Sequence, residues 1–352
     1  MANSCISSKE EDTPSARNLG HDDDIAVNNL STLIPMLLDT LCGIGLSKIE
    51  RLSIHLSNVN LKIYLLTRQK RIDRALDRYL PKANTKPATL HRAMRYSLFA
   101  GGKRLRPILC LAAAEAFRGK LEDALPLACA LECIHTYSLV HDDLPSMDND
   151  DFRRGRPTCH KVFGEGIAVL TGDALLTLAF EIVSRAKPSP RHDTSMLFRE
   201  IAVAAGSRKL IAGQVADLEA EGKNVKRRQL QFIHENKTAA ILRSSVRLGA
   251  MSANADARKL SAITRFGQRL GLAFQIIDDI LDVTQTSQIL GKSAGKDVAA
   301  RKATYPAVIG LEQSRAEARR LTREAHKALS VFRSDAADPL HELANYLIER
   351  EY

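Results

Sequence analysis

The chain has 352 residues, of which 45% are apolar and 26% charged, and its formal net charge is +10. This length supports a sizeable buried core, either as one large domain or as two ordinary ones, and the composition is that of a soluble globular protein. Trp is absent and aromatic residues make up only 5%, which favours helices over a β-sandwich or a β-barrel.

The positive charge does not point to nucleic acid, because the chain has neither a tract of five consecutive basic residues nor a basic stretch interleaved with aromatics. Anionic phosphate substrates explain the excess at least as well. No membrane span is evident, since the most apolar early stretch, 30–46, is interrupted by Pro35, Asp39 and two glycines. No CxxC pair is present, so we expect a reduced, cytoplasmic environment. The six cysteines are Cys5, Cys42, Cys110, Cys129, Cys133 and Cys159.

The order of polar and apolar segments predicts an N-terminal extension over residues 1–60, of which 1–25 read as a polar, disordered tail, and a catalytic domain over 61–352. No convincing strand with period-two alternation is present, so the predicted fold class is all-α. Helices are predicted at 61–80, 89–99, from Pro107 onward, 121–140, 164–187, 194–221, 226–253, 256–288, 302–331 and 337–350.

An acidic segment at 278–282 lies in the last part of a predicted apolar helix. Asp278 and Asp282 are four residues apart and therefore share one helix face, with Cβ atoms about 6 Å apart. Asp279 points roughly 100° away from that face. The alternative is a solvated acidic helix end, but the apolar neighbours indicate burial, and acidic residues are rarely buried without a partner.

A second acidic segment, from Asp142 to Asp151, contains Pro145. Asp142 and Asp148 are six residues apart, which on a continuous helix would place them on different faces. Proline interrupts the helical hydrogen-bond ladder, so residues 144–147 can bulge and return Asp148 to the side of Asp142. A capping or turn role is the alternative for the acidic residues from Asp148 onward, and we expect it for some of them.

A basic loop at 101–107 reads Gly-Gly-Lys-Arg-Leu-Arg-Pro. Two glycines let the backbone approach an anion, and Lys103 and Arg106 offer a point charge and a bidentate fork for phosphate. Carboxylate clusters beside such cations suggest a site for a metal-bound, polyanionic substrate, because carboxylates this close repel one another without a cation between them.

These segments together resemble the trans-polyprenyl diphosphate synthase family. The match rests on the basic loop, on DDLPSMD at 142–148 with Arg153 and Arg154 after it, and on DDILD at 278–282. Further family motifs follow the same order over about 62–350: 213–217, Lys237-Thr238, 291–292, 295–297 and 302–306. The first motif is most similar to that of bacterial-type farnesyl diphosphate synthases.

The resemblance implies an isoprenoid-synthase fold, a single bundle of about ten or more helices around a deep central cavity, as a homodimer. It also implies metal and substrate roles. The Mg²⁺ ligands would be Asp142, Asp148 and Asp278, holding three ions per site with substrate bound. Isopentenyl diphosphate would be held by Lys103, Arg106, Arg154 and His135, and the allylic diphosphate by Arg153, Lys237, Lys292 and Lys302.

The implied reaction is a head-to-tail condensation of isopentenyl diphosphate with dimethylallyl or geranyl diphosphate. Metals and cations stabilise the leaving diphosphate, and an allylic carbocation forms in a site that excludes water. The carbonyl of Lys237, the hydroxyl of Thr238 and the amide oxygen of Gln275 would stabilise that cation.

Product length is expected to depend on Tyr137 and Ser138, about one turn before Asp142 on the same helix. A bulky ring at Tyr137 would act as a floor and give (2E,6E)-farnesyl diphosphate, although a ring that is simply packed core is the alternative. Geranylgeranyl diphosphate synthase is the close competitor. A non-catalytic partner subunit is less favoured, because all motifs are intact. A class I terpene cyclase is also less favoured, because it normally lacks the second aspartate-rich motif.

Overall fold

The computed structural model describes residues 46–284, 303–332 and 334–349. The chain divides into two compact units, Met1–Val59 and Asn60–Tyr352. Apart from the start of the first described helix, the predicted extension 1–60 lies outside the described residues.

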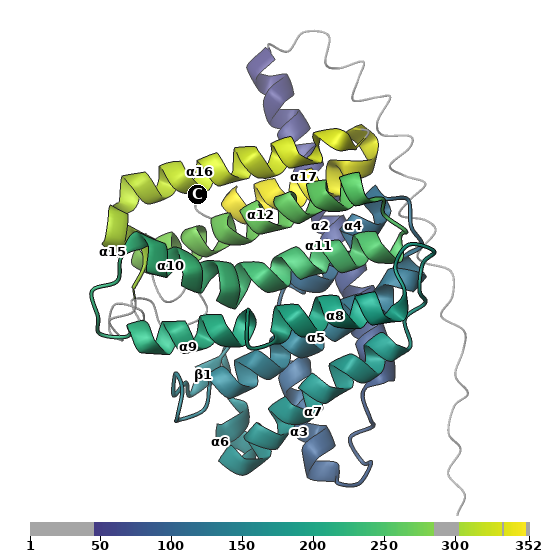
Figure 1. The fold of residues 1–352 in the computed structure, drawn as a ribbon, viewed down its shortest axis with the longest axis vertical. Helices are drawn as coiled ribbons and strands as arrows, with labels where there is room; N and C mark the ends of the chain where they lie inside the picture. Colours follow the sequence, from purple (N-terminus) through teal and green to yellow (C-terminus); the bar gives the residue numbers. More distant parts are fainter. Residues whose placement is uncertain (1–45, 285–302, 333, 350–352) are drawn as a thin grey trace, which may run out of the picture. The chain divides into compact units, whose positions relative to one another are not determined.

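The described residues fold almost entirely as helices, which confirms the predicted all-α class (Figure 1). The α-helices up to the one that carries the 278–282 segment are α2 Leu46–Tyr79, α3 Ala88–Leu98, α4 Leu105–Ala116, α5 Leu121–Asp142, α6 Cys159–Phe163, α7 Glu165–Ser184, α8 Thr194–Ala205, α9 Leu210–Ala220, α10 Arg227–His234, α11 Ala240–Ser252 and α12 Ala257–Thr284. The later ones are α15 Tyr305–Ile309, α16 Leu311–Ala328 and α17 Ser334–Glu349. A π-helical turn, η1 Glu235–Ala239, joins α10 to α11, and a 3₁₀ turn, η2 Leu329–Val331, follows α16.

Three predicted helices are interrupted in the structure, and one further element was not predicted. The predicted helix 226–253 contains the π-helical turn η1 between α10 and α11. The predicted helix 194–221 is two helices, α8 and α9, separated by residues 206–209. The predicted helix 302–331 breaks at Gly310, whose φ of 84° lies in the left-handed region that a helix interior excludes. A two-stranded ribbon, β1 Phe152–Arg153 and β2 Arg156–Pro157, was not predicted, because two residues per strand are too few to show alternation. Its turn is formed by Arg154 and Gly155, both with positive φ, as a two-residue hairpin requires.

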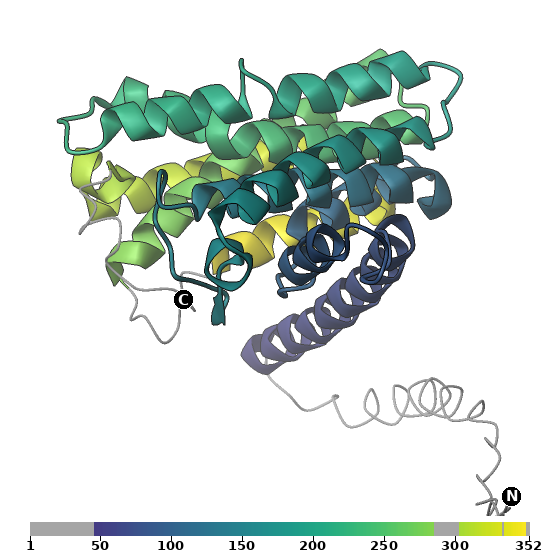
Figure 2. The same cartoon turned by 90° about the horizontal axis from the view of Figure 1, so that it is seen from below.

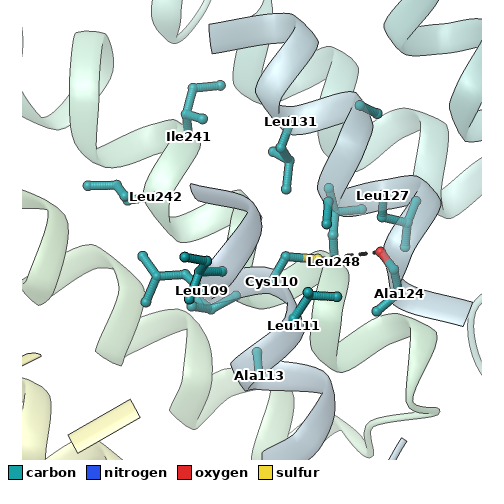
Figure 3. Packing of buried hydrophobic residues seen from close by; sticks show 14 of the residues in the cluster. Leu109, Cys110, Leu111, Ala113, Ala124, Leu127, Leu131, Ile241, Leu242 and Leu248 are labelled. Atoms are coloured by element: carbon teal, nitrogen blue, oxygen red, sulfur yellow. Dashed lines mark hydrogen bonds between the residues drawn. The ribbon is translucent and has the colours of Figure 1, made fainter. Parts of the chain in front are cut away.

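The main core lies where α4, α5 and α11 pack together (Figure 3). Leu109, Leu131, Leu242 and Leu248 are among its fully buried side chains. The close approach of α11 to α4 depends on Gly249, because a Cβ there would collide with the carbonyl group of Cys110. Burial of apolar area, which stabilises by about 25 cal/mol per Å², contributes most to holding such a bundle together.

The remaining helices run alongside this core. Figures 1 and 2, two views at right angles, show α12 beside α11 and α16 beside α12, and both pairs are in contact. On the other side α7 packs against α5, α3 and α6. Three parts of the chain lie toward the left of Figure 1. They are the C-terminal end of α12, which carries the 278–282 segment, the C-terminal end of α9, and the ribbon.

Helix α7 is the one helix, within the part of the chain that is described, with enough length and apolar composition to cross a membrane. In its most apolar window 44% of the residues are buried within the protein. Its contacts with α5, α3 and α6 are those of a bundle helix.

Candidate active site

The acidic segment that begins at Asp142 returns on itself after α5 ends there. The amide of Asp148 donates a hydrogen bond to the carbonyl oxygen of Asp142 over 2.8 Å, and the amide of Asn149 donates to the carbonyl oxygen of Leu144 over 3.1 Å. Pro145 lies at the exposed tip of this turn. The predicted bulge that brings Asp148 back to Asp142 is therefore confirmed.

This arrangement leaves a carboxylate pair that favours a cation. Burial, aided by the negative charge of Asp148, raises the pKa of Asp142 to about 6, although the positive charge of Lys237 acts in the opposite direction. A buried carboxylate beside a second carboxylate is stabilised when a positive ion binds next to it. The residues present therefore fit a hard divalent cation held by carboxylate oxygens.

The other acidic residues of this segment are committed to protein partners. Arg153 Nε donates to Asp143 Oδ1 over 2.7 Å, and Arg153 Nη2 lies 3.4 Å from Asp150 Oδ2. Lys161 Nζ lies 2.8 Å from Asp151 Oδ1. The carboxylates of Asp143, Asp150 and Asp151 therefore have structural partners. The capping or turn role expected for some residues from Asp148 onward stays a prediction. Arg153, predicted as a diphosphate ligand, is held by these carboxylates beside Asp142.

The 278–282 segment lies near the end of α12, as predicted. Asp278 is half-buried, whereas Asp279 and Asp282 are 4% and 3% exposed. Asp279 accepts hydrogen bonds from Gln275 Nε2 (3.2 Å) and from the backbone amide of Tyr305 (2.9 Å). This agrees with the expectation that Asp279 faces away from the site and Asp278 towards it.

The basic loop contributes one structural cation. Arg104 is 3% exposed and donates from Nε to Asp73 Oδ1, from Nη1 to Glu132 Oε1 and from Nη2 to the carbonyl oxygen of Leu98, each over 2.8 Å. A buried guanidinium needs such partners for its fixed donors. Arg104 therefore holds the loop in place and is unavailable to a substrate.

The neighbouring cations of the loop are placed differently. Lys103 is exposed, and its Nζ lies 5.7 Å from the centre of the Tyr346 ring. Arg106 Nη1 donates to His135 Nε2 over 3.2 Å. Burial lowers the pKa of Arg106, and Glu132 and Asp278 counteract this, so Arg106 lies within the field of the 278–282 segment.

His135 is held neutral. Burial, together with the positive charges of Arg106 and Arg154, lowers the pKa of His135 well below its ordinary value. Since arginine only donates, the neutral imidazole accepts at Nε2. His135 can then fix the orientation of Arg106 without adding a further positive charge.

Gly102 lies against Arg154, because a Cβ on Gly102 would collide with the guanidinium of Arg154. Arg154 Nη1 donates to the carbonyl oxygen of Gly101. Gly102 thus allows Arg154 to dock here, where its charge also acts on Arg106. That the two glycines let the backbone approach an anion stays a prediction.

A π-helical turn carries Lys237 and Thr238 between α10 and α11. Lys237 Nζ donates to Asp217 Oδ2 on α9 over 2.6 Å. Thr238 Oγ1 donates to Gln275 Oε1 on α12 over 2.8 Å. The structure therefore brings the three residues predicted to stabilise the cation together from two separate parts of the chain.

Tyr137 and Ser138 lie on α5, one turn before Asp142. Tyr137 is 6% exposed and forms an edge-to-face contact with His141, with ring centres 5.8 Å apart. Burial and the charge of Asp142 raise the pKa of Tyr137 to about 12. By helical spacing Ser138 shares the face of Asp142, whereas Tyr137 shares that of His141, which donates to the carbonyl oxygen of Val169 on α7.

Two predicted site residues, Lys292 and Lys302, lie outside the described residues. Two residues that hold the cations of the site were not among the predicted site residues, although one of them, Asp217, lies in the 213–217 motif. Glu132 is a buried carboxylate beside Arg104, and its charge also opposes the lowered pKa values of Arg106 and Arg154. Asp217 holds Lys237. The signal for Glu132 was an acidic residue inside an apolar helical run, which burial makes costly unless a cation is near.

Within the described ranges, no group of three or more His, Cys, Asp and Glu side chains is placed so that it could hold a metal ion. Mg²⁺ is usually held by one or two carboxylates, with water and substrate phosphates completing its shell. Asp142, Asp148 and Asp278 are half-buried carboxylates with that chemistry.

A model of the polyprenyl synthetase family matches residues 87–337. The chain belongs to this family. It is 48% identical to the heterodimeric geranylgeranyl pyrophosphate synthase large subunit 1 of Arabidopsis thaliana, over 84% of this chain and 81% of that protein. It is 49% identical to a geranylgeranyl pyrophosphate synthase of Catharanthus roseus, over 84% of this chain and 83% of that protein. Its structure matches an FPP/GFPP synthase of Zymomonas mobilis with a TM-score of 0.72, at 38% identity, covering 82% of this chain and 99% of that one.

Membership of the polyprenyl synthetase family identifies the chain as a trans-prenyltransferase of isoprenoid biosynthesis, and the fold is the isoprenoid-synthase fold. The reactants of prenyl chain elongation are isopentenyl diphosphate and an allylic diphosphate. Both are polyanions, in keeping with the cations that surround the two acidic segments.

Proposed function

We propose that this enzyme condenses isopentenyl diphosphate head-to-tail with dimethylallyl and then geranyl diphosphate, giving (2E,6E)-farnesyl diphosphate. The observation that carries the proposal is that each acidic segment lies close to a basic residue from another part of the bundle. The positive charge of Lys237 acts on Asp142 in the Asp142–Asp148 turn, and the negative charge of Asp278 acts on Arg106.

The allylic diphosphate is assigned to the acidic side of the site. Asp142, Asp148 and Asp278 would hold Mg²⁺, with three ions proposed when substrate is bound. When bound, Mg²⁺ supplies positive charge that makes diphosphate a better leaving group. Lys237 and Arg153 add fixed positive charges there, and Lys292 and Lys302 are proposed to join them.

Isopentenyl diphosphate is assigned to the cations of the basic loop. Arg106 is oriented by His135, and Arg154 is docked on the loop by its hydrogen bond to Gly101. Their forked donors match a diphosphate, and Lys103 adds a mobile charge at the surface. Because His135 is neutral, it can accept the hydrogen bond that orients Arg106. It carries no negative charge that would compete with the substrate for the guanidinium.

Dipoles of the protein are proposed to stabilise the allylic cation. The carbonyl of Lys237, Thr238 Oγ1 and Gln275 Oε1 present oxygen atoms, which are favourable beside a carbocation. The double bond of isopentenyl diphosphate then attacks, and the departing diphosphate removes a proton. The apolar surroundings exclude the water that would otherwise quench the cation.

Product length is assigned to Tyr137, supported by its burial one turn deeper than Asp142, with Ser138 beside it. A ring at that depth would stop the chain at fifteen carbons. Geranylgeranyl diphosphate is the second candidate product, because the names of the similar plant proteins specify geranylgeranyl pyrophosphate synthases.

We further propose a cytoplasmic homodimer that binds neither nucleic acid nor membranes stably. Val169 and Leu170, which are 41% and 54% exposed on α7, are apolar surface of the kind that a second subunit covers. The four cysteines that the structure describes are free and buried, in keeping with a reducing compartment.

One assay tests the proposal. Purified protein is incubated with Mg²⁺, labelled isopentenyl diphosphate and each allylic primer in turn, and the products are sized by chromatography. We expect a fifteen-carbon product and no turnover when Mg²⁺ is chelated. A twenty-carbon product would favour the second candidate, and no product from the chain alone would favour a role as a partner subunit.

A further inference from the structure

Asp279 is buried at the centre of a hydrogen-bonded chain that reaches the reaction site. Its Oδ1 accepts from Gln275 Nε2 over 3.2 Å, and Gln275 Oε1 accepts from the hydroxyl of Thr238 over 2.8 Å. Its Oδ2 accepts from the backbone amide of Tyr305 over 2.9 Å. The chain therefore runs from the start of α15, through α12, to the π-helical turn.

The chemistry of these groups fixes the direction of every bond. A carboxylate only accepts hydrogen bonds, so Asp279 requires the NH₂ of the Gln275 amide to face it. The amide oxygen of Gln275 must then face Thr238, whose hydroxyl hydrogen it takes up. Both lone pairs of Thr238 Oγ1 consequently remain available to face another group.

We propose that Asp279 is a positioning residue, whose carboxylate sets the orientation of the Gln275 amide and, through it, the direction of the Thr238 hydroxyl dipole. The proposal rests on the proposed function, in which Thr238 faces the allylic cation. With this orientation the oxygen of Thr238, and not its hydrogen, is directed at the developing positive charge. A chain of hydrogen bonds also polarises its members, so the negative charge of Asp279 strengthens the dipole at Thr238.

His234 supports the same carboxylate from the other side. Its Nε2 lies 3.5 Å from Asp279 Oδ2, and its ring stacks on that of Tyr305, with centres 5.3 Å apart. Burial lowers the pKa of His234 to about 3, so the contact is between a neutral imidazole and a carboxylate and is not an ion pair. His234 directly precedes the π-helical turn, which ties that turn to Asp279.

Asp279 and its neighbour Asp278 have different proposed roles. Asp279 is 4% exposed and each of its oxygens accepts an N–H of the protein, whereas Asp278 is half-buried and faces the cations of the site. Two consecutive aspartates therefore have different predicted effects: loss of Asp278 weakens metal binding, and loss of Asp279 misorients the oxygen that meets the cation.

The decisive substitution is Asp279→Asn, which keeps the size but lets Gln275 turn over. The amide nitrogen of Gln275 would then donate a hydrogen bond to Thr238 Oγ1. One lone pair of that oxygen would no longer be available to face the site. We expect kcat to fall about 10²-fold, with KM for both diphosphates and the Mg²⁺ concentration for half-maximal rate within about threefold of the parent enzyme. The matched Asp278→Asn should instead raise the Mg²⁺ requirement at least about tenfold.

A double-mutant cycle with Thr238→Val shows whether Asp279 acts through Thr238. We expect the double variant to be no slower than Thr238→Val alone. As a control, Leu321→Ala, a buried change on α16, should lower Tm without lowering kcat at 15–20 °C or so, well below unfolding.

The outcomes separate this proposal from the proposed function. If the parent enzyme makes no prenyl diphosphate, the proposed function fails. If the parent enzyme is active but Asp279→Asn retains kcat, shifts the Mg²⁺ requirement as Asp278→Asn does, or adds its full effect to that of Thr238→Val, the positioning role of Asp279 is wrong.

Discussion

The backbone amide of Asp148 donates a 2.8 Å hydrogen bond to the carbonyl oxygen of Asp142, the last residue of α5. This single bond closes a six-residue excursion and returns the second carboxylate to the first. Two acidic residues that helical spacing alone would separate become neighbours at the end of a buried helix.

The length of this turn is predicted to matter more than its proline. Deleting Ser146 would shift Asp148 out of register with Asp142, and a misplacement of about 1 Å can cost about 10²-fold in rate. Pro145→Ala keeps the length and both backbone hydrogen bonds, so it should retain most activity. Steady-state rates of the two variants decide this, and equal rates would contradict it.

Removing a metal-binding carboxylate is predicted to abolish turnover. Asp142→Ala or Asp278→Ala should lower kcat/KM by about 10³-fold or more, because charge on the leaving diphosphate is no longer stabilised. Circular dichroism should show an unchanged fold. Near-parental activity with Mg²⁺ in either variant would refute the assignment of that residue.

Tyr137→Ala is predicted to lengthen the product beyond fifteen carbons, because the ring would no longer close the site one turn below Asp142. Chromatographic sizing of the products is the measurement. Phe266→Leu, a change at another fully buried ring, should alter stability and leave the product unchanged. A farnesyl product from Tyr137→Ala would remove Tyr137 as the residue that sets length.

Adjacent cations of the basic loop are predicted to behave differently. Arg104→Met would leave Glu132 buried without its partner and should lower the free energy of unfolding by about 3–5 kcal/mol. Lys103→Met, at an exposed position, should change it by less than about 0.5 kcal/mol and instead raise KM for isopentenyl diphosphate. Urea unfolding and steady-state kinetics separate the two effects, and equal destabilisation would contradict the structural role of Arg104.

The free energy of unfolding is predicted to fall at acid pH, partly because of His234. Chiefly because this residue is buried, its pKa in the folded protein is about 3, below its ordinary value of 6.5. As pH falls below about 6.5, the unfolded chain takes up a proton on this group and the folded protein does not, so stability present above that pH is lost. At about pH 5 the loss from this residue should be about 2 kcal/mol.

The measurement is urea unfolding at about pH 8 and pH 5 for the parent enzyme and for His234→Gln. The variant should lose less stability than the parent between the two pH values, whatever its stability at pH 8. An identical loss in both proteins would show that His234 is protonated as easily in the folded state as in the unfolded state.

The sequence by itself determined the helical class, the positions of most helices, and the return of Asp148 to Asp142. These follow from local rules: apolar periodicity and the interruption caused by a proline. That Asp278 joins these two carboxylates at one site stays a prediction. The breaks at 206–209 and Gly310 were not predicted, because one glycine inside a periodic stretch does not reveal its backbone conformation.

The tertiary structure alone decided which charged residues can act on a substrate. Arg104 and Arg106 are two residues apart at the start of α4, yet Glu132 from another helix binds the first and His135 orients the second. Asp278 and Asp279 are adjacent, yet Asp279 is held by the backbone amide of Tyr305, which is distant in sequence, as well as by the nearby Gln275. Burial and hydrogen bonding at these sites depend on contacts between separate helices, and no local pattern specifies which side chains will meet there.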